Sequence, residues 1–303
     1  MSREACPICD TQLPAPAIRA PDRLHGTPGA FAVAVCDTCG AGVTLPRVQA
    51  HELASFYPAQ YSPYEAVRGS AAAAISTAIQ FWQGLRTRQT PPMQAVAALD
   101  PGQGVDVGCG RGDLAAMFVK RGWRMVGVEP APQACEVARK RGVDAREGVL
   151  ATVELEPQAY DAALFRQSLE HTIDPVGDLR LVHPALAPDG IVAISVPNFG
   201  CWQSRRFGAS WYHLDLPRHR THFTAGALDR TLRSAGFDDV QVTTSTSVEG
   251  LWASLQYRVL GRCLFPSGLR LRVAVALCPL GLPIALGLNR SGGDLLHAVA
   301  RKA

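Results

Sequence analysis

Short apolar runs alternate with stretches of helical periodicity through the middle of the chain. The apolar runs have the length and branched side chains of buried strands, at 105–107, 125–128, 160–165 and 191–196, and a further short strand is expected at 143–146. Between them, apolar residues recur at the spacing of a helix face, at 114–119, 131–141 and 179–186, with a Pro-Asp-Gly turn at 188–190. Strands that alternate with helices predict an α/β domain built on a parallel sheet.

The pattern continues with one more helix and two more strands. Thr224 precedes a helical pattern that runs to Ala235, and Gly236 stands where helices often end in a left-handed residue. Strand patterns follow at 240–244 and 295–300. These elements extend the predicted sheet towards the C-terminus.

The first strong strand ends in a glycine-rich turn that leads directly into a helix. Gly108 and Gly110 allow positive φ and let a ligand lie against bare backbone. The next strand closes on Glu129, at the spacing of about 20 residues where doubly wound proteins place a carboxylate for ribose hydroxyls. The pattern predicts a nucleoside site, whereas a plain tight turn is the simpler alternative.

The spacing within this turn distinguishes two classes of cofactor. Dinucleotide proteins need Gly-x-Gly-x-x-Gly, whereas this chain has Asp106, Gly108, Gly110 and Gly112 at alternate positions. An acid at Asp106 would repel a diphosphate, but it suits the cationic amino-acid end of S-adenosylmethionine. The turn therefore favours S-adenosylmethionine.

Residues 99–236 resemble the class I S-adenosylmethionine-dependent methyltransferases. Four motifs carry the resemblance in order: VDVGCGRGDLA, GVEPAP, YDAALFRQSLEHTIDP and LAPDGIVAISVPN. It implies a doubly wound, Rossmann-like sheet of seven strands whose final strand runs antiparallel beside the previous one. The cofactor-binding residues expected on this basis are Asp106, Gly108, Cys109, Gly110, Asp113, Glu129, Pro130, Gln167 and Ser168.

Composition agrees with one α/β core and a small appendage. The chain has 303 residues, of which 47% are hydrophobic and 18% charged. The net charge of +4 is mild and the basic residues are scattered, so nucleic acid is not an expected partner. Residues 1–12 are polar and include two cysteines, which argues against a signal peptide and for the cytoplasm, where cysteines are thiols or metal ligands.

Two C-x-x-C knuckles, Cys6 with Cys9 and Cys36 with Cys39, open the chain. The stretch between them, 11–35, is Pro-rich and poorly periodic, with too few apolar residues to fold alone. Four thiolates around one structural Zn²⁺ would stabilise such a region. Iron, redox-active pairs and a disulfide staple are the alternatives.

The N-terminal part also resembles the small zinc-binding region of some bacterial methyltransferases, including sugar C-methyltransferases, in which an acidic-aromatic segment like 52–61 follows. Those sugar enzymes carry a further large C-terminal domain, for which this chain is too short. An Ala-rich helix is expected at 69–90, broken by Pro91 and Pro92, as a cofactor cap or as simple packing. The expected organisation is a zinc-binding region at 1–48, a helical linker at 49–95 and a methyltransferase domain at 96–303.

Two insertions are expected at the carboxyl edge of the sheet, where open α/β sheets bind ligands. The first, 197–223, resembles the W-x-x-L-D-x-P-R-H-x-x-H-F signature of a large bacterial methyltransferase group. Its Tyr212, His213, His219 and His222, with His171 beyond the fourth strand, are the candidate catalytic residues, because removing a hydroxyl proton needs a base near neutral pH. A metal site on these histidines, or an ordering role for His171 in its turn, are alternatives.

The second insertion, 249–291, is apolar and contains two prolines within its longest apolar run, which is too short to span a bilayer. Arginines flank its apolar parts at 251–288, as in helices that lie in a headgroup layer. The segment predicts a lid for a hydrophobic or lipid-linked acceptor and contact with the inner face of the membrane. Core packing or a dimer interface is the alternative.

The sequence thus predicts a methyltransferase that acts on oxygen or carbon of a lipid-like, sugar or secondary metabolite. A catalytically inactive scaffold that keeps the fold is a second hypothesis, against which Asp106, Gly108, Gly110 and Glu129 argue. A nucleic-acid methyltransferase is a third, which the charge pattern does not favour.

Overall fold

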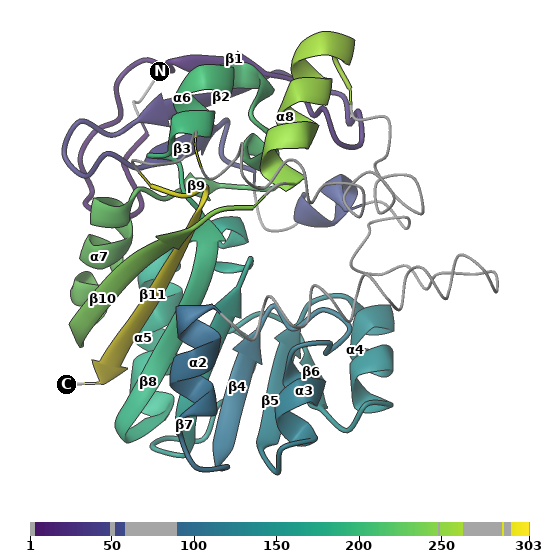
Figure 1. Ribbon diagram of the computed structural model, residues 1–303, viewed down its shortest axis with the longest axis vertical. Helices are drawn as coiled ribbons and strands as arrows, with labels where there is room; N and C mark the ends of the chain where they lie inside the picture. Colours follow the sequence, from purple (N-terminus) through teal and green to yellow (C-terminus); the bar gives the residue numbers. More distant parts are fainter. Residues whose placement is uncertain are drawn as a thin grey trace.

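The structure is a computed structural model, and it describes residues 4–48, 52–57, 90–247, 249–262, 287 and 292–302. It contains a large and a small sheet, one above the other in Figure 1. The large sheet comprises β4 (Gln103–Val107), β5 (Arg124–Glu129), β6 (Asp144–Glu147), β7 (Tyr160–Arg166), β8 (Leu186–Pro197), β10 (Phe237–Ser245) and β11 (Leu295–Lys302). The small sheet comprises β1 (Ile18–Ala20), β2 (Phe31–Val35), β3 (Gly42–Leu45) and β9 (Thr221–His222).

The large sheet has the strand order β10-β11-β8-β7-β4-β5-β6. Strands β4 to β8 are parallel, and β11 runs antiparallel between β8 and β10. The predicted seven-stranded doubly wound sheet with an antiparallel final strand is confirmed. The direction of winding changes between β4 and β7, which is the switch point where such sheets bind ligands.

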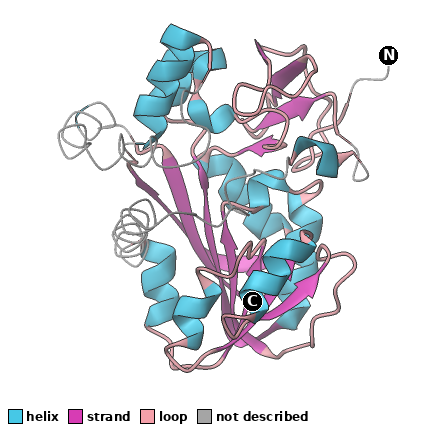
Figure 2. Cartoon of the chain, turned by 90° about the vertical axis from the view of Figure 1, so that its right-hand side faces the viewer, coloured by secondary structure: helices cyan, strands magenta, loops and turns pink. Residues whose placement is uncertain are grey.

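Helices cover both faces of this sheet (Figure 2). They are α2 (Pro91–Ala97), α3 (Ala115–Val119), α4 (Pro132–Arg139), α5 (Pro175–Ala185) and α7 (Ala225–Ser234). Ala162 and Leu164 of β7 belong to the buried cluster under α2, α3 and α4, whereas Ala163 and Phe165 belong to the one under α5 and α7. Alternate side chains of one strand thus enter two cores, as expected for a strand buried on both faces.

Several local predictions can be compared directly. The Thr224 side chain accepts a hydrogen bond from the amide of Ala227 at the start of α7, and Gly236 has φ +94° beyond its end, so both ends are confirmed. Pro91 and Pro92 begin α2, because a first-turn proline loses no needed amide hydrogen bond. The helix predicted before them lies outside the described residues. The prediction that the Pro-Asp-Gly turn at 188–190 precedes the strand was wrong. Strand β8 includes these residues at a register shift, with Asp189 at φ +62°.

The N-terminal stretch 11–35 is more ordered than predicted. It contains β1 and β2, and four of the five residues of β2 are buried. Although the stretch is Pro-rich and was expected to have too few apolar residues to fold alone, the run Phe31–Val35 packs both of its faces. One of those faces lies against Trp211, Leu214 and Leu216 of the insertion at 197–223.

The insertion at 197–223 completes the small sheet. Its strand β9 pairs antiparallel with β3, opposite Gly42 and Val43. The remaining elements are the helices α6 (Trp202–Phe207) and α8 (Glu249–Leu260) and the 3₁₀ turns η1 (Leu53–Phe56), η3 (Leu169–His171), η4 (Gly208–Ser210) and η5 (Tyr212–Leu214). The small sheet lies beyond the carboxyl end of β8, on the side towards which the parallel strands point (Figure 1). None of the helices among the described residues is long and apolar enough to cross a bilayer.

Candidate active site

The glycine turn after β4 approaches the turn after β7. Gly108, Gly110 and Gly112 have φ of +71°, +52° and +71°. A Cβ on Gly108 would lie 2.6 Å from Cβ of Ser168, whereas a Cβ on Gly110 would meet no atom of the described residues within 4 Å. Gly108 therefore permits a close approach of two turns, and Gly110 has bare backbone that no described side chain covers at the switch point.

Glu129 braces this turn from the end of β5. Its side chain is buried, with Oε2 accepting a hydrogen bond from the Gly110 amide at 3.0 Å and Oε1 from the Ala131 amide at 2.9 Å. The carboxylate predicted to hold ribose hydroxyls therefore lies at the glycine turn, and it orders the backbone there.

Asp106 lies inside β4, only 2% exposed, and its carboxyl is hydrogen-bonded to the backbone of Ala115 at the start of α3. Burial raises its pKa to about 7, with Arg166 opposing and Glu129 adding to the shift. A buried acid with a raised pKa beside a glycine turn is a common feature of functional sites. A cationic ligand group nearby would favour its ionised form.

The other predicted cofactor residues lie around the same turns with one exception. Cys109 and Ser168 are buried, and the Ser168 hydroxyl has no hydrogen-bond partner among the described residues. Gln167 has φ +53°, and its side-chain amide donates to the Ser195 carbonyl at 3.2 Å. Pro130 is exposed directly after Glu129. Asp113, in contrast, points to solvent and pairs with Arg141.

Two of the predicted histidines form a close pair. The rings of His171, from η3, and His219 lie edge to face with centroids 4.6 Å apart. Nδ1 of His171 lies 3.1 Å from the Arg218 carbonyl and 3.1 Å from the Tyr57 hydroxyl, and Nδ1 of His219 lies 2.8 Å from the His213 carbonyl. A ring nitrogen beside a carbonyl must donate, so Nδ1 carries the proton in both rings and Nε2 keeps a lone pair.

Two carboxylates lie near the lone pair of His219. Its Nε2 is 3.8 Å from Oδ2 of Asp215 and 4.0 Å from Oε1 of Glu170. Burial lowers the pKa of His171 to about 3 and that of His219 to about 4, so both are neutral. A neutral imidazole beside the ionised carboxylate of Asp215 can accept a proton and be stabilised once charged.

Sequence reasoning missed Glu170, although it directly precedes His171. Glu170 is 1% exposed, neither of its carboxyl oxygens has a hydrogen-bond partner among the described residues, and burial raises its pKa to about 8. Glu170, His171 and His219 each offer one possible metal-ligating atom, and these atoms lie within 4.8 Å of one another. The signal available in the sequence was an acidic residue in the turn that follows a buried strand, next to a candidate histidine.

The remaining predicted catalytic residues have polar or aromatic partners of their own, although the ring of His222 also lies beside that of His219, with centroids 6.4 Å apart. Nε2 of His222, on β9, lies 3.0 Å from the Thr44 hydroxyl. His213 pairs with Asp294 at 3.3 Å, and the ring of Tyr212 packs between His213 and Tyr257. The structure thus brings His171 and His219 together and gives His213, His222 and Tyr212 contacts within the fold.

The four N-terminal cysteines converge. Sγ of Cys6 lies 3.6 Å from Sγ of Cys39, Sγ of Cys9 lies 3.5 Å from Sγ of Cys36, and all four lie within 4.8 Å of one another. Four sulfurs bound to one tetrahedral zinc at about 2.3 Å are roughly 3.8 Å apart, so the set fits zinc. All four are free thiols, which excludes the predicted alternative of a disulfide staple in this structure.

Comparisons with known proteins agree with this geometry. A family model described as "Methyltransferase domain" matches residues 79–242, more than half of the chain. The chain is 31% identical over 100 residues to a ubiquinone biosynthesis O-methyltransferase of Methylocella silvestris, across 31% of this chain and 39% of the relative. It is 30% identical over 146 residues to the enzyme of that name from Azorhizobium caulinodans, across 44% and 58%. The matches thus span less than two thirds of these relatives.

Solved structures show the same fold. A SAM-dependent methyltransferase of Thermotoga maritima, titled a possible histamine N-methyltransferase, superposes with a TM-score of 0.50 at 20% identity, covering 74% of this chain and 91% of that one. A SAM-dependent methyltransferase from Archaeoglobus fulgidus gives 0.50 at 16%, covering 74% and 94%. With the family match, the seven-stranded sheet and the glycine turn at its switch point, the chain belongs to the class I S-adenosylmethionine-dependent methyltransferases.

Proposed function

We propose that this enzyme methylates an oxygen or carbon atom of a small acceptor, and that the pair His171 and His219 takes up the proton that the acceptor loses. The observation that carries the proposal is the lone pair on Nε2 of His219, which lies 3.8 Å from the ionised carboxylate of Asp215 and 4.0 Å from the carboxyl group of Glu170. His171 lies in η3, three residues after Ser168, and a Cβ added to Gly108 of the glycine turn would lie 2.6 Å from Cβ of Ser168. A base is therefore near the expected cofactor.

S-adenosylmethionine, when bound, supplies an electrophilic methyl group. Gly108, Gly110 and Glu129 would hold its nucleoside, and Asp106 lies where a cationic amino-acid end can be neutralised. The protein's own contribution is to orient the acceptor, exclude water and hold the departing proton on Nε2 of His219. The ionised Asp215 would stabilise the imidazolium that results.

Zinc belongs to the proposal in a structural role. Cys6, Cys9, Cys36 and Cys39 would fill all four tetrahedral positions with thiolate. No position would then remain for water or substrate, so the metal would stabilise the N-terminal region and take no part in methyl transfer.

The proposed acceptor is hydrophobic. Of the three predicted classes of acceptor, which are lipid-like compounds, sugars and secondary metabolites, it belongs to the first. The relatives' name, ubiquinone biosynthesis O-methyltransferase, supports an acceptor of this kind. On α8, Trp252, Leu255 and Val259 are exposed along one face. Of the predicted lid at 251–288, the structure describes 251–262 and residue 287.

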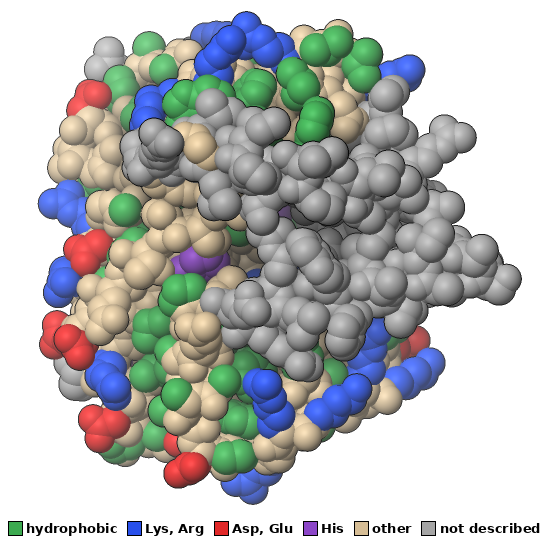
Figure 3. All heavy atoms as spheres, viewed as in Figure 1, with side chains coloured by type: hydrophobic (Ala, Val, Ile, Leu, Met, Phe, Trp, Pro, Cys, Tyr) green, Lys and Arg blue, Asp and Glu red, His purple; other side chains and the backbone are tan. Residues whose placement is uncertain are grey.

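A membrane contact would deliver such an acceptor. Arg205 and Arg206 of α6 and Arg258 and Arg262 are exposed, and α6 packs against α8. Hydrophobic and basic side chains lie side by side at this end of the molecule (Figure 3). The proposal is therefore a cytoplasmic enzyme that contacts anionic lipid on the inner face of the membrane.

The test is transfer of a radiolabelled methyl group from S-adenosylmethionine to fractions of source-cell extract. The proposal expects label in the lipid-soluble fraction, lost in His219→Ala. Label in polar metabolites would replace the lipid-like acceptor with a sugar or secondary metabolite. Tight cofactor binding with no transfer to any fraction would overturn catalysis and favour the inactive scaffold, and label in nucleic acid would favour the third hypothesis.

A further inference from the structure

A buried arginine joins the N-terminal region to the histidine pair. Arg218 is fully buried, and each of the five N–H groups of its guanidinium has an acceptor. Asp22 accepts two of these bonds, at 2.7 and 2.9 Å, the Phe56 carbonyl accepts one at 3.2 Å, and Asp215 accepts from Nη2 at 2.6 Å and from Nε at 3.1 Å.

This bridge contacts both catalytic histidines. Asp215 binds Arg218 mainly through Oδ1, and its Oδ2 lies 3.8 Å from Nε2 of His219. The backbone carbonyl of Arg218 faces Nδ1 of His171 at 3.1 Å. Arg218 carries one positive charge and lies between two carboxylates, so the three groups together carry one net negative charge. Because Asp22 neutralises part of the Arg218 charge, Asp215 does not have to neutralise all of it.

Asp22 is itself held rigidly. Its Oδ1 accepts hydrogen bonds from the amides of Leu24 and His25 at 3.0 and 3.1 Å, and its Oδ2 accepts one from the amide of Thr27 at 3.2 Å. These bonds fix the carboxylate in a backbone turn of the N-terminal region. The position of the Arg218 guanidinium is therefore set from outside the methyltransferase sheet.

Thr44 of β3 makes a second connection. Its hydroxyl donates to the His219 carbonyl at 2.6 Å, and Nε2 of His222 lies 3.0 Å from this Thr44 hydroxyl oxygen. The Thr44 amide donates to the Arg220 carbonyl at 3.0 Å. One hydroxyl from the N-terminal region thus holds the backbone of His219 and the ring of a second histidine.

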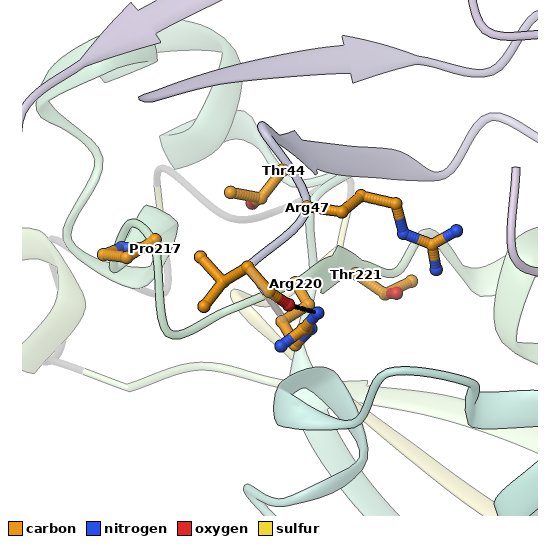
Figure 4. Close-up of a pocket in the computed structure, with 6 residues that line it drawn as sticks. Thr44, Arg47, Pro217, Arg220 and Thr221 are labelled. Carbon is orange, nitrogen blue, oxygen red and sulfur yellow. Dashed lines mark hydrogen bonds between the residues drawn. The ribbon is translucent and has the colours of Figure 1, made fainter. Parts of the chain in front are cut away.

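Arg220 secures the same segment from its other side. Its Nη2 donates to the backbone carbonyl of Val48, beside a small cavity lined by Thr44, Arg47, Pro217 and Thr221 (Figure 4). The segment 217–222 is therefore held between β3 and the residues that follow it. The N-terminal region thus holds the segment that carries His219 and whose Arg218 carbonyl contacts His171.

We propose that Asp22 and Thr44 are positioning residues for methyl transfer, acting on His219 through Arg218 and through the His219 backbone. The inference rests on the proposed function, and it makes the N-terminal region a working part of the active site. Neither residue touches the glycine turn. Cofactor binding should therefore be independent of both.

The sharpest test compares Thr44→Val with Thr44→Ser. Valine keeps the shape but removes the hydroxyl, whereas serine keeps the hydroxyl. Thr44→Val should lower kcat about tenfold to hundredfold, the cost expected for a misplaced catalytic group, with an unchanged Kd for S-adenosylmethionine. Thr44→Ser should restore most of the rate. The matched control is Thr231→Val on α7, where a buried hydroxyl donates to the Ala227 carbonyl at 2.7 Å far from the site, and there kcat should not change.

A second readout needs no acceptor. The ring ¹⁵N shifts of His219 report its tautomer and surroundings, and they should change in Thr44→Val and in Asp22→Asn but not in Thr231→Val. Folded Thr44→Val protein with wild-type kcat and unchanged His219 shifts would overturn the proposal. If the wild-type enzyme methylates nothing but its His219 shifts respond as expected, the positioning stands and the proposed function fails.

Discussion

The carboxylate of Glu129 accepts a hydrogen bond at 3.0 Å from the amide of Gly110. Among the three glycines of this turn, Gly110 is the one at which an added Cβ would meet no described atom within 4 Å. One side chain therefore orders the turn and lies where a nucleoside is expected. Glu129→Ala should weaken S-adenosylmethionine binding tenfold to a hundredfold, because a hydrogen bond to a charged group contributes about 1.5–3 kcal/mol. Calorimetry measures the effect. Unchanged affinity would remove Glu129 from the cofactor site.

The cysteine cluster predicts about one zinc per chain in a purely structural role. Cys6→Ser combined with Cys36→Ser should abolish the bound metal and lower the unfolding temperature, because folding of this region and metal binding are coupled. Elemental analysis and thermal unfolding check both effects. Cys201→Ser, which changes a free cysteine outside the cluster, is the control and should keep the zinc. Metal retained in the double variant, or iron in its place, would contradict the assignment.

Substitution of the histidine pair should separate turnover from binding. His219→Ala and His171→Ala should each lower turnover by about 10²–10⁴-fold, the usual contribution of a general base, with little change in cofactor affinity. His183→Ala on α5, whose ring packs on Phe237, is the matched control and should leave turnover unchanged. Near-normal turnover in both test variants would move the base to His213, His222 or Tyr212.

His222 predicts a pH dependence of stability. Burial lowers its pKa to about 3, whereas the unfolded chain has about 6.5. The folded protein therefore keeps His222 neutral while the unfolded chain takes up a proton, so this stabilisation is complete above about pH 6.5 and is lost as the pH falls.

His222→Gln removes this titration. Between pH 7 and pH 5 the free energy of unfolding should fall by about 2 kcal/mol less in the variant than in the wild type, since each pKa unit is worth about 1.4 kcal/mol. Urea unfolding at the two pH values measures the difference. Equal losses would mean that His222 does not enter the folded state as a buried neutral group.

The exposed face of α8 predicts binding to anionic vesicles. Wild-type protein should float with phosphatidylglycerol vesicles at low salt, less so at high salt, and not with phosphatidylcholine alone. Trp252→Glu combined with Val259→Glu should abolish flotation, whereas Leu181→Glu, an exposed leucine on α5, should not. No flotation of the wild type, or concentration-dependent dimerisation that the double variant abolishes, would assign this face to packing or to a second copy of the chain.

The large sheet was predictable because its signals are local. Most strands of the methyltransferase sheet have their own apolar run, although β6, with the sequence Asp-Ala-Arg-Glu, does not. Thr224 and Gly236 mark the ends of α7 by rules that act within a few residues. The glycine turn and Glu129 follow from the same logic, since the turn after one parallel strand lies beside the end of the next.

The frame of the histidine pair could not be predicted in this way. Asp22 has no periodic pattern around it, and its partner Arg218 lies far along the chain, so only tertiary structure brings them together. Strand β9 has two residues, which are too few to show the alternation of apolar and polar positions that predicts a strand. The sequence favours His219 only slightly over His213 and His222, through its neighbours Pro217 and Arg218. Their distinct partners in the structure, Asp215 for His219, Asp294 for His213 and Thr44 for His222, separate them clearly.

The pairing of β3 with β9 sets an order on the folding of this chain. Residues 42–45 leave the ribosome long before residues 221–222, so β3 has an open edge until the last part of the insertion is made. Closing that edge also delivers His219 and His222 to their places. The nascent chain thus hides an aggregation-prone strand and assembles its proposed catalytic base in the same late folding step.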